Sequence, residues 1–328
     1  MKKLSELDSA SAIAIRDCMG TKKNEKILVI TDELKRVIGQ SLHENAVRLG
    51  YESLLVEMKS GKINGEEPSD IIADLMQRFD VVFCPTAKSL THTDARRNAS
   101  AKGVRIATFP GITKDVMIRG MNADYKSISK RTLKLKTILE TGKIIRVTAP
   151  AGTDITFSIA GRKAFASKGL FHAKGESGNL PTGEAFLAPV EGSSNGVFVV
   201  DGSMAGLGLI KNANLPMRQA GIKIEVENGY ATKISGGTLA NKLKVMLDKV
   251  GKDARNIAEF GIGTNDSAKL SGVLLEDEKV MGTIHIALGN NVSMGGSVNV
   301  PIHLDGVVKK PTVWMDEQLL MKDGKLLI

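Results

Sequence analysis

Aromatic residues are scarce in this chain of 328 residues: they make up 4% of it and include one tryptophan. Proteins that bind single-stranded nucleic acid stack the bases on aromatic side chains, so this composition argues against that class. The net charge of +9 could attract an acidic partner. Its basic residues are dispersed along the chain, however, and we therefore predict no nucleic-acid partner.

Cysteines and long apolar runs are also missing. The two cysteines, Cys18 and Cys84, lie in unrelated contexts, so they provide neither a disulfide framework nor a thiolate zinc motif. No apolar stretch approaches the roughly 20 residues of a membrane-spanning helix, and the apolar run near the N-terminus is too short for a secretion signal. We therefore expect a cytoplasmic protein without a membrane partner.

Strand and helix signals alternate in the first 141 residues. The predicted strands cover residues 26–30, 53–58, 80–84 and 104–109, and the predicted helices cover 32–49, 68–79, 89–102 and 124–141. Such alternation predicts a parallel sheet with helices on both faces. No G-x-G-x-x-G follows the first strand and no phosphate-binding P-loop is present. The sequence thus predicts an α/β, Rossmann-like domain over residues 1–141, without a dinucleotide.

Short alternating segments and many glycines follow from residue 143. Here the predicted strands cover residues 144–149, 153–159, 196–200, 222–227 and 231–234, one helix covers 238–250, and residues 322–325 form a tight turn. This pattern is typical of a β-rich α+β domain, which we place at residues 142–328.

A histidine and an aspartate stand two residues apart in the segment V-N-V-P-I-H-L-D, residues 298–305. If this segment is a strand, alternate side chains lie on opposite faces. His303 and Asp305 then share one face, and the apolar side chains occupy the other. Pro301 indicates an edge strand or a bulge.

Three further segments have the same arrangement. His285 lies in T-I-H-I-A-L and Glu259 in I-A-E-F-G-I, each opposite an apolar face, and Glu184 follows a Pro-Thr-Gly turn. Each signal alone has an ordinary explanation, such as a solvated acid, a salt bridge or a core histidine. Together they leave three explanations open: the groups are solvated, paired with opposite charges or bound to a metal, because burying an unpaired charge is costly.

These motifs also resemble a known family. The stretches G-N-L-P-T-G-E (178–184), N-I-A-E-F-G-I-G-T-N (256–265), G-T-I-H-I-A-L-G (282–289) and I-H-L-D (302–305) resemble metallo-aminopeptidases of the aminopeptidase T and aminopeptidase S type. The resemblance implies that two divalent cations, Zn, Co or Mn, are bound by Glu184, Glu259, His285, His303 and Asp305. It predicts a metalloprotease, a hydrolase that removes N-terminal residues from peptides, with Glu259 as ligand or proton carrier, and it implies a homodimer.

The same superfamily includes iron-dependent 2,5-dihydroxypyridine dioxygenases, which give the alternative prediction. By that resemblance His285, His303 and Asp305 hold one Fe(II), and the substrate is a small molecule. The run S-L-T-H-T-D-A-R (89–96) resembles this branch, and it makes His92 a candidate for contacting substrate or transferring a proton. A solvated histidine at a helix start is the ordinary explanation for His92.

One feature departs from the peptidases, which carry a tyrosine shortly after the first histidine of the site. Residues 289–296 contain none, and the chain's tyrosines are Tyr51, Tyr125 and Tyr230. A relative that keeps the fold and has lost the chemistry is therefore a third alternative.

Overall fold

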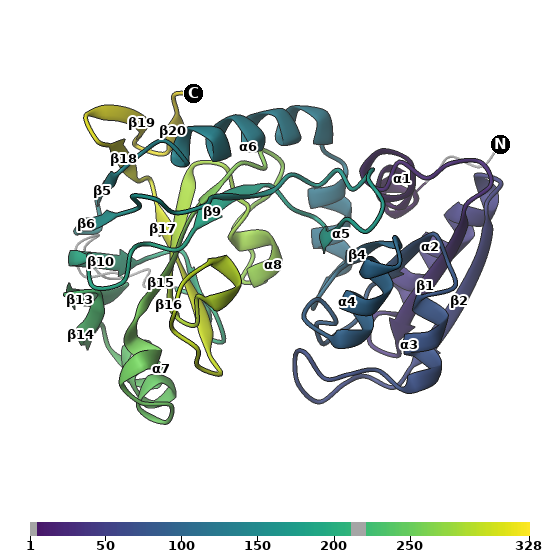
Figure 1. The fold of residues 1–328 in the computed structure, drawn as a ribbon, viewed down its shortest axis with the longest axis horizontal. Helices are drawn as coiled ribbons and strands as arrows, with labels where there is room; N and C mark the ends of the chain where they lie inside the picture. Colours follow the sequence, from purple (N-terminus) through teal and green to yellow (C-terminus); the bar gives the residue numbers. More distant parts are fainter. Residues whose placement is uncertain (1–4, 211–220) are drawn as a thin grey trace. The chain divides into compact units, whose positions relative to one another are not determined.

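The computed structural model describes residues 5–210 and 221–328, which form two compact units (Figure 1). The first unit comprises the chain up to Ser129 together with Ser167–Thr182, and the second comprises Lys130–Ala166 together with Gly183–Ile328. The predicted domain boundary between residues 141 and 142 stays a prediction. The predicted mixed α/β character is confirmed, since a parallel sheet and two large antiparallel sheets are present.

The first unit is built on a parallel sheet with the strand order β2-β1-β3-β4-β8. Its strands are β1 (Lys26–Asp32), β2 (Glu52–Met58), β3 (Val81–Cys84), β4 (Arg105–Thr108) and β8 (Ser177–Asn179). The predicted strands correspond to β1–β4, whose apolar runs are fully buried in β1 and β3. Cys18 and Cys84 are free thiols, and both are buried.

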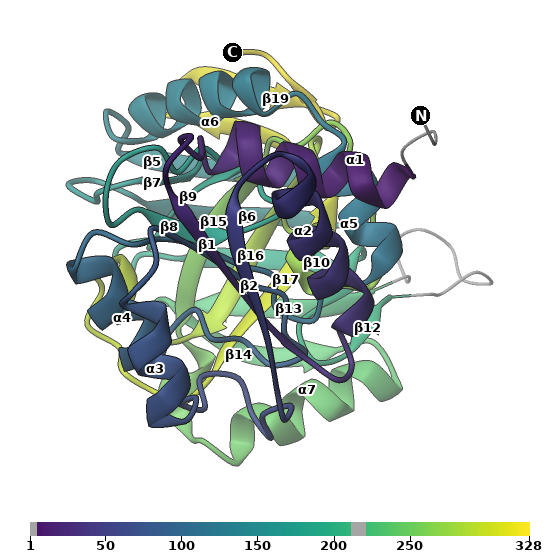
Figure 2. The ribbon, with the colours of Figure 1, turned by 90° about the vertical axis from the view of Figure 1, so that its right-hand side faces the viewer.

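Helices cover both faces of this sheet. They are α1 (Glu6–Ile13), followed by a π-helical turn (Ala14–Cys18), α2 (Arg36–Arg48), α3 (Asp70–Met76), α4 (Asp94–Ala101) and α5 (Lys114–Met121). Helices α3 and α4 lie on one side of the strands, and α1, α2 and α5 lie on the other (Figure 2). Threonine side chains cap α4 and α5 at Thr93 and Thr113, which satisfies backbone N–H groups that a helix leaves free. Helices α1 and α5 were not predicted from the sequence.

The second unit contains two antiparallel sheets. The eight-stranded sheet comprises β14 (Tyr230–Ser235), β13 (Ile222–Glu227), β10 (Asn195–Val200), β6 (Thr153–Ser158), β5 (Ile144–Ala149), β18 (Thr312–Met315), β19 (Gln318–Lys322) and β20 (Lys325–Leu326), in that order. The seven-stranded sheet comprises β12 (Gly208–Leu209), β11 (Ser203–Met204), β17 (His303–Lys309), β16 (Thr283–Gly289), β15 (Ile257–Gly263), β9 (Glu184–Leu187) and β7 (Phe165–Ser167), in that order.

One apolar core draws on both sheets. Phe157 of β6 packs against Phe260 of β15 with ring centroids 5.2 Å apart, and the same cluster includes Leu135 and Leu139 from α6 and Leu243 from α7. The helical segments are α6 (Tyr125–Leu139), α7 (Thr238–Asp248), α8 (Leu274–Asp277) and the 3-10 turns Lys252–Arg255 and Val292–Met294. One face of the seven-stranded sheet packs against this core. Polar side chains can therefore lie on its other face.

The predicted strand over residues 298–305 is wrong in its first part. Residues 298–302 are not a strand, and β17 begins at His303. Pro301 explains the difference, because its ring removes the N–H that a strand ladder needs. Within the described residues, no helix is both long enough and apolar enough to cross a membrane.

Candidate metal centre

Four neighbouring strands of the seven-stranded sheet carry the five predicted metal ligands. Residues that lie directly opposite each other in an antiparallel pair project from the same face of the sheet. The opposed pairs are Glu184 with Gly263, Glu259 with Ala287, His285 with Gly261, Asp305 with Ala287 and His303 with Gly289. The strand register therefore places all five side chains on one face, as alternation along each strand predicts.

The opposite face of the same strands anchors them in the core. Phe260, Ile286 and Leu304 alternate with the site residues and are buried in the core cluster. On the site face, small residues leave room for the polar groups. The ring of His285 lies over Gly261, where an added Cβ would sit 2.0 Å from its Nε2 atom.

Glu259 lies between the two imidazoles. Its Oε1 atom is 3.1 Å from Nε2 of His285, and its Oε2 atom is 3.1 Å from Nε2 of His303. Nε2 of His303 is also 3.3 Å from Oδ1 of Asp305. Glu184 adjoins the cluster, with its Oε2 atom 3.7 Å from Nε2 of His285. The structure thus brings together all five predicted residues.

A backbone contact orients the imidazole of His303. Its Nδ1 atom lies 2.7 Å from the carbonyl oxygen of Asn290, so Nδ1 carries the hydrogen and donates it. The lone pair of the neutral ring is then on Nε2, which faces Glu259 and Asp305. Metal-binding histidines are commonly held in this way by a second hydrogen bond.

The donors present fit a divalent metal ion. Glu259, His303 and Asp305 each offer one ligand atom, and these atoms lie within 4.8 Å of one another. The His285 ring, 1% exposed, adds a second imidazole, and its Nδ1 atom has no hydrogen-bond partner. Imidazole and carboxylate ligands suit iron, manganese and zinc. This set could hold a metal, while the ligand role of each residue stays a prediction.

The charges of the cluster are strongly coupled. Burial lowers the pKa of His285, but the hydrogen bond and charge of Glu259 outweigh burial and raise that pKa to about 9. Burial raises the pKa of Asp305, but the charge and hydrogen bond of His303 outweigh it and hold that pKa well below its usual range. The carboxylates thus stabilise positive charge at this point, whether it comes from protons on the imidazoles or from a metal ion.

Sequence reasoning missed two charged residues beside this cluster, Glu278 and Lys279. Nζ of Lys279 lies 2.7 Å from Oε2 of Glu184 and 2.7 Å from Oε2 of Glu278. Burial, with the charges of Asp305 and Glu184, raises the pKa of Glu278 to about 8 against the opposing effect of Lys279. The one available signal was a lysine directly after three acids, Glu276, Asp277 and Glu278.

His92, the other predicted catalytic residue, lies in the first unit. It is exposed in the turn before α4, and its carbonyl oxygen accepts a hydrogen bond from Arg97 at 2.7 Å. Its predicted part in catalysis stays a prediction.

A half-buried ion pair between Arg162 and Glu191 holds the loop that leads into β17. Glu191 accepts hydrogen bonds from the side chain of Asn291 at 2.9 Å and from the backbone of Ser297 at 2.8 Å. Its partner Arg162 donates to the carbonyl oxygen of Gly295 at 2.8 Å. These contacts hold the loop whose Asn290 carbonyl orients His303.

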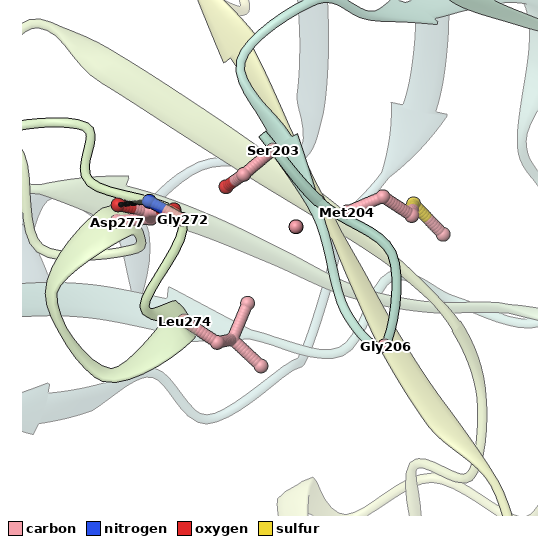
Figure 3. A pocket seen from close by; sticks show the side chains of 7 residues that line it. Ser203, Met204, Gly206, Gly272, Leu274 and Asp277 are labelled. Atoms are coloured by element: carbon pink, nitrogen blue, oxygen red, sulfur yellow. Dashed lines mark hydrogen bonds between the residues drawn. The ribbon is translucent and has the colours of Figure 1, made fainter. Parts of the chain in front are cut away.

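A separate cavity of about 200 Å³ also lies in the second unit (Figure 3). It is lined by Ser203, Met204, Gly206, Gly208, Gly272, Leu274 and Asp277. The Asp277 carboxylate accepts hydrogen bonds from the backbone of Ser271 at 2.7 Å and Gly272 at 3.0 Å. This carboxylate stabilises its own loop, and the cavity is lined by none of the five predicted ligands.

Comparisons with known proteins were made over the whole chain. The model of the NicX family, described as 2,5-dihydroxypyridine 5,6-dioxygenase, matches residues 19–328. A 2,5-dihydroxypyridine 5,6-dioxygenase of Pseudomonas putida KT2440 is 23% identical over 274 residues, 80% of this chain and 72% of that protein.

Two solved structures share the fold. The 2,5-dihydroxypyridine dioxygenase from Pseudomonas putida KT2440 has a TM-score of 0.81 and 19% identity, over 99% of this chain and 98% of that one. AmpT from Thermus thermophilus has a TM-score of 0.68 and 18% identity, over 98% of this chain and 99% of that one. At these identities the two likenesses show a shared fold alone.

The predicted aminopeptidase activity, with its hydrolase and metalloprotease classes, is wrong. The family match points to a dioxygenase, and the likeness to AmpT, at 18% identity, shows the fold alone. The sequence prediction failed because aminopeptidases and dioxygenases of this type share the same kinds of metal ligand. The absence of a tyrosine from residues 289–296 argued against a peptidase. The prediction that the chain is an enzyme is confirmed, and the family implies a metal cofactor. Because the match covers residues 19–328, the chain belongs to the NicX family of 2,5-dihydroxypyridine 5,6-dioxygenases.

Proposed function

We propose that this protein is an Fe(II)-dependent dioxygenase that opens the ring of a 2,5-dihydroxypyridine or a close analogue. The observation that carries the proposal is the convergence of two imidazoles and Asp305 around Glu259 on one face of the sheet, in a chain matched by this family from residue 19 to 328. Two histidines and one carboxylate with open positions are the ligand set typical of non-haem Fe(II) oxygenases.

In this proposal His285, His303 and Asp305 hold the metal. Fe(II) supplies open coordination positions at which O₂ chemistry takes place. Glu259 touches the Nε2 atoms of both imidazoles, so its part is to keep the two rings facing the same point. The apolar face behind these strands keeps their backbone fixed, because Phe260 and Ile286 are fully buried.

The reaction balances without a further reductant. The bond between ring carbons 5 and 6 breaks, and each of these carbons receives one atom of the same O₂ molecule. The electrons that reduce O₂ come from the electron-rich ring, so the product equals substrate plus O₂. His92 remains our candidate for contacting substrate or moving a proton, on the basis of the S-L-T-H-T-D-A-R motif.

The remaining predictions belong to the same proposal. They are a Rossmann-like domain at residues 1–141, a metal-binding catalytic domain at residues 142–328, a cytoplasmic location, and a homodimer without nucleic-acid or membrane partners. Size measurements in solution test the homodimer directly.

An oxygen-uptake assay tests this function. Protein loaded anaerobically with Fe(II) should consume 2,5-dihydroxypyridine and O₂ in equal amounts, with no added electron donor. Asp305→Asn should remove this activity, because the amide cannot supply the anionic ligand. Asp201→Asn is the matched control: Asp201 is also buried in the second unit, but its carboxylate accepts from the backbone of Lys309 at 2.8 Å. Wild-type protein that holds Fe(II) and consumes neither compound would contradict the proposal.

A further inference from the structure

Lys279 is a buried cation beside the candidate metal centre. Its side chain is 4% exposed, and its Nζ atom lies 2.7 Å from carboxylate oxygens of both Glu184 and Glu278. Lysine is among the residues least often buried, and it is tolerated there when paired. Burial lowers its pKa, but the charges of Glu184 and Glu278 outweigh burial and hold that pKa above its usual range.

The backbone holds this lysine in place. Its N–H donates to the carbonyl oxygen of Glu276 at 2.9 Å, and its own carbonyl oxygen accepts from the N–H of Asn265 at 2.8 Å. Lys279 therefore sits at the fixed exit of α8, six positions before His285 in the chain. The ammonium position follows from the fold and not from a mobile surface loop.

Glu184 connects the lysine to the metal cluster. The same Oε2 atom that pairs with Lys279 lies 3.7 Å from Nε2 of His285. Beyond His285 follow Glu259, His303 and Asp305, each in contact with the next. Asp305 in turn hydrogen-bonds Glu278, so the contacts lead back to Lys279. A cation from the protein thus already occupies the carboxylates of Glu184 and Glu278 beside the cluster.

We infer that Lys279 limits the centre to one metal ion by taking, with its ammonium group, the place that a second divalent cation would occupy between Glu184 and Glu278. This inference rests on the proposed function, since it concerns the same metal centre. A second cation would have to share the Glu184 oxygen with the ammonium, and two like charges at this distance in a buried site repel strongly. Without the ammonium, the carboxylates of Glu184 and Glu278 would form an oxygen-rich site beside His285, which suits manganese and similar ions.

Metal counting in a lysine variant tests the inference. Lys279→Met keeps the length of the side chain and removes its charge. We expect equilibrium dialysis against Mn(II), followed by elemental analysis, to give one ion per chain for the wild type and two for Lys279→Met. The electron paramagnetic resonance spectrum of the variant should show the coupling of two neighbouring Mn(II) ions. The double variant Lys279→Met/Glu184→Gln should return to one ion.

Lys309→Met is the matched control. Lys309 belongs to the same unit, but its side chain is 44% exposed and pairs with Asp201 at 3.9 Å, so its loss should leave one ion per chain. A Lys279→Met protein that unfolds cooperatively and binds a single ion would overturn the inference and leave the proposed function intact. One bound iron without ring opening would contradict the proposed function and leave the inference intact. Two ions in the wild type would overturn the inference.

A second variant serves if Lys279→Met does not fold. In the wild-type background, Glu184→Gln should still bind one ion, because Glu184 is engaged by Lys279 and is not needed as a ligand. Loss of the bound ion in this variant would show that Glu184 ligates it, and the inference would be wrong.

Discussion

His303→Ala is expected to weaken metal binding by more than about 100-fold, since loss of even an outer partner of a metal ligand costs roughly 10–100-fold. The imidazole is the one group of the cluster that contacts both Glu259 and Asp305. Ring-opening activity should fall with the metal. Competition with a chelator of known affinity measures the first effect, and oxygen uptake measures the second.

The fold should survive this change, because the His303 side chain is 31% exposed at the start of β17. Thermal unfolding of the metal-free proteins checks this point. His43→Ala is the matched control: His43 lies in α2 of the first unit and contacts Ser53 at 2.9 Å, so its loss should leave the metal in place. Full metal affinity in His303→Ala would show that the ion binds elsewhere.

Gly261→Ala is expected to lower kcat/KM by at least roughly 100-fold, since a displacement of about 1 Å in a catalytic group can have that effect. The added Cβ would lie 2.0 Å from Nε2 and 2.1 Å from Cε1 of His285. The ring is 1% exposed and packed, so it must leave its position. The backbone of Gly261 does not have a positive φ, so the alanine itself causes no strain.

A double-mutant cycle separates this steric effect from a general loss of stability. Gly261→Ala alone should lower the free energy of unfolding by about 1–3 kcal/mol, the usual cost of overpacking. In a His285→Ala background the ring is absent, so the same substitution should cost much less. Equal costs in the two backgrounds, measured by urea unfolding, would contradict the close packing of His285 on Gly261.

Much of the candidate site followed from the alternation of side chains along strands. His303 and Asp305 are two residues apart, and β17 places them on one face, as predicted. Glu259 also lies on the predicted face of its strand, although β15 has an irregular register between Ile257 and Glu259. Sequence alone could not show that β9, β15, β16 and β17 lie side by side, because strand order depends on long-range pairing.

Lys279 shows what the sequence could not reveal. A lysine that follows acidic residues normally lies on the surface, and only the turn after α8 directs this one toward Glu184. The close approach of Gly261 and His285 was equally hidden, since it depends on the register of β15 with β16. Both features arise from tertiary contacts, and nothing in the sequence of the contacting segments indicates them.

The strands of the fold were also predictable only in part. The first four parallel strands could be predicted, because each is a compact apolar run followed by a helix signal. β8 could not, since Ser177–Asn179 has no apolar residue and pairs with β4 from a distant part of the chain. The valines before His303 made this segment look like a strand. Pro301 and the contacts of the loop with Glu191 prevent strand pairing there.

The choice of reaction could not be made from ligand types alone. Histidine, glutamate and aspartate serve both a hydrolase and an oxygenase, and the difference lies in how many ions the site holds and what enters its open positions. The match to the NicX family over residues 19–328 decides between the two classes, and the pairing of Glu184 with Lys279 offers a physical reason for a single ion.

Isotope labelling of the product tests the central claim most directly. Fe(II)-loaded protein is given 2,5-dihydroxypyridine under ¹⁸O₂ in ordinary water, and the ring-opened product is examined at once by mass spectrometry. The account predicts that each product molecule carries both atoms of one labelled O₂ molecule, apart from any label that an aldehyde-type oxygen exchanges with water. A ring-opened product whose new oxygen atoms come from water at the earliest times would contradict it.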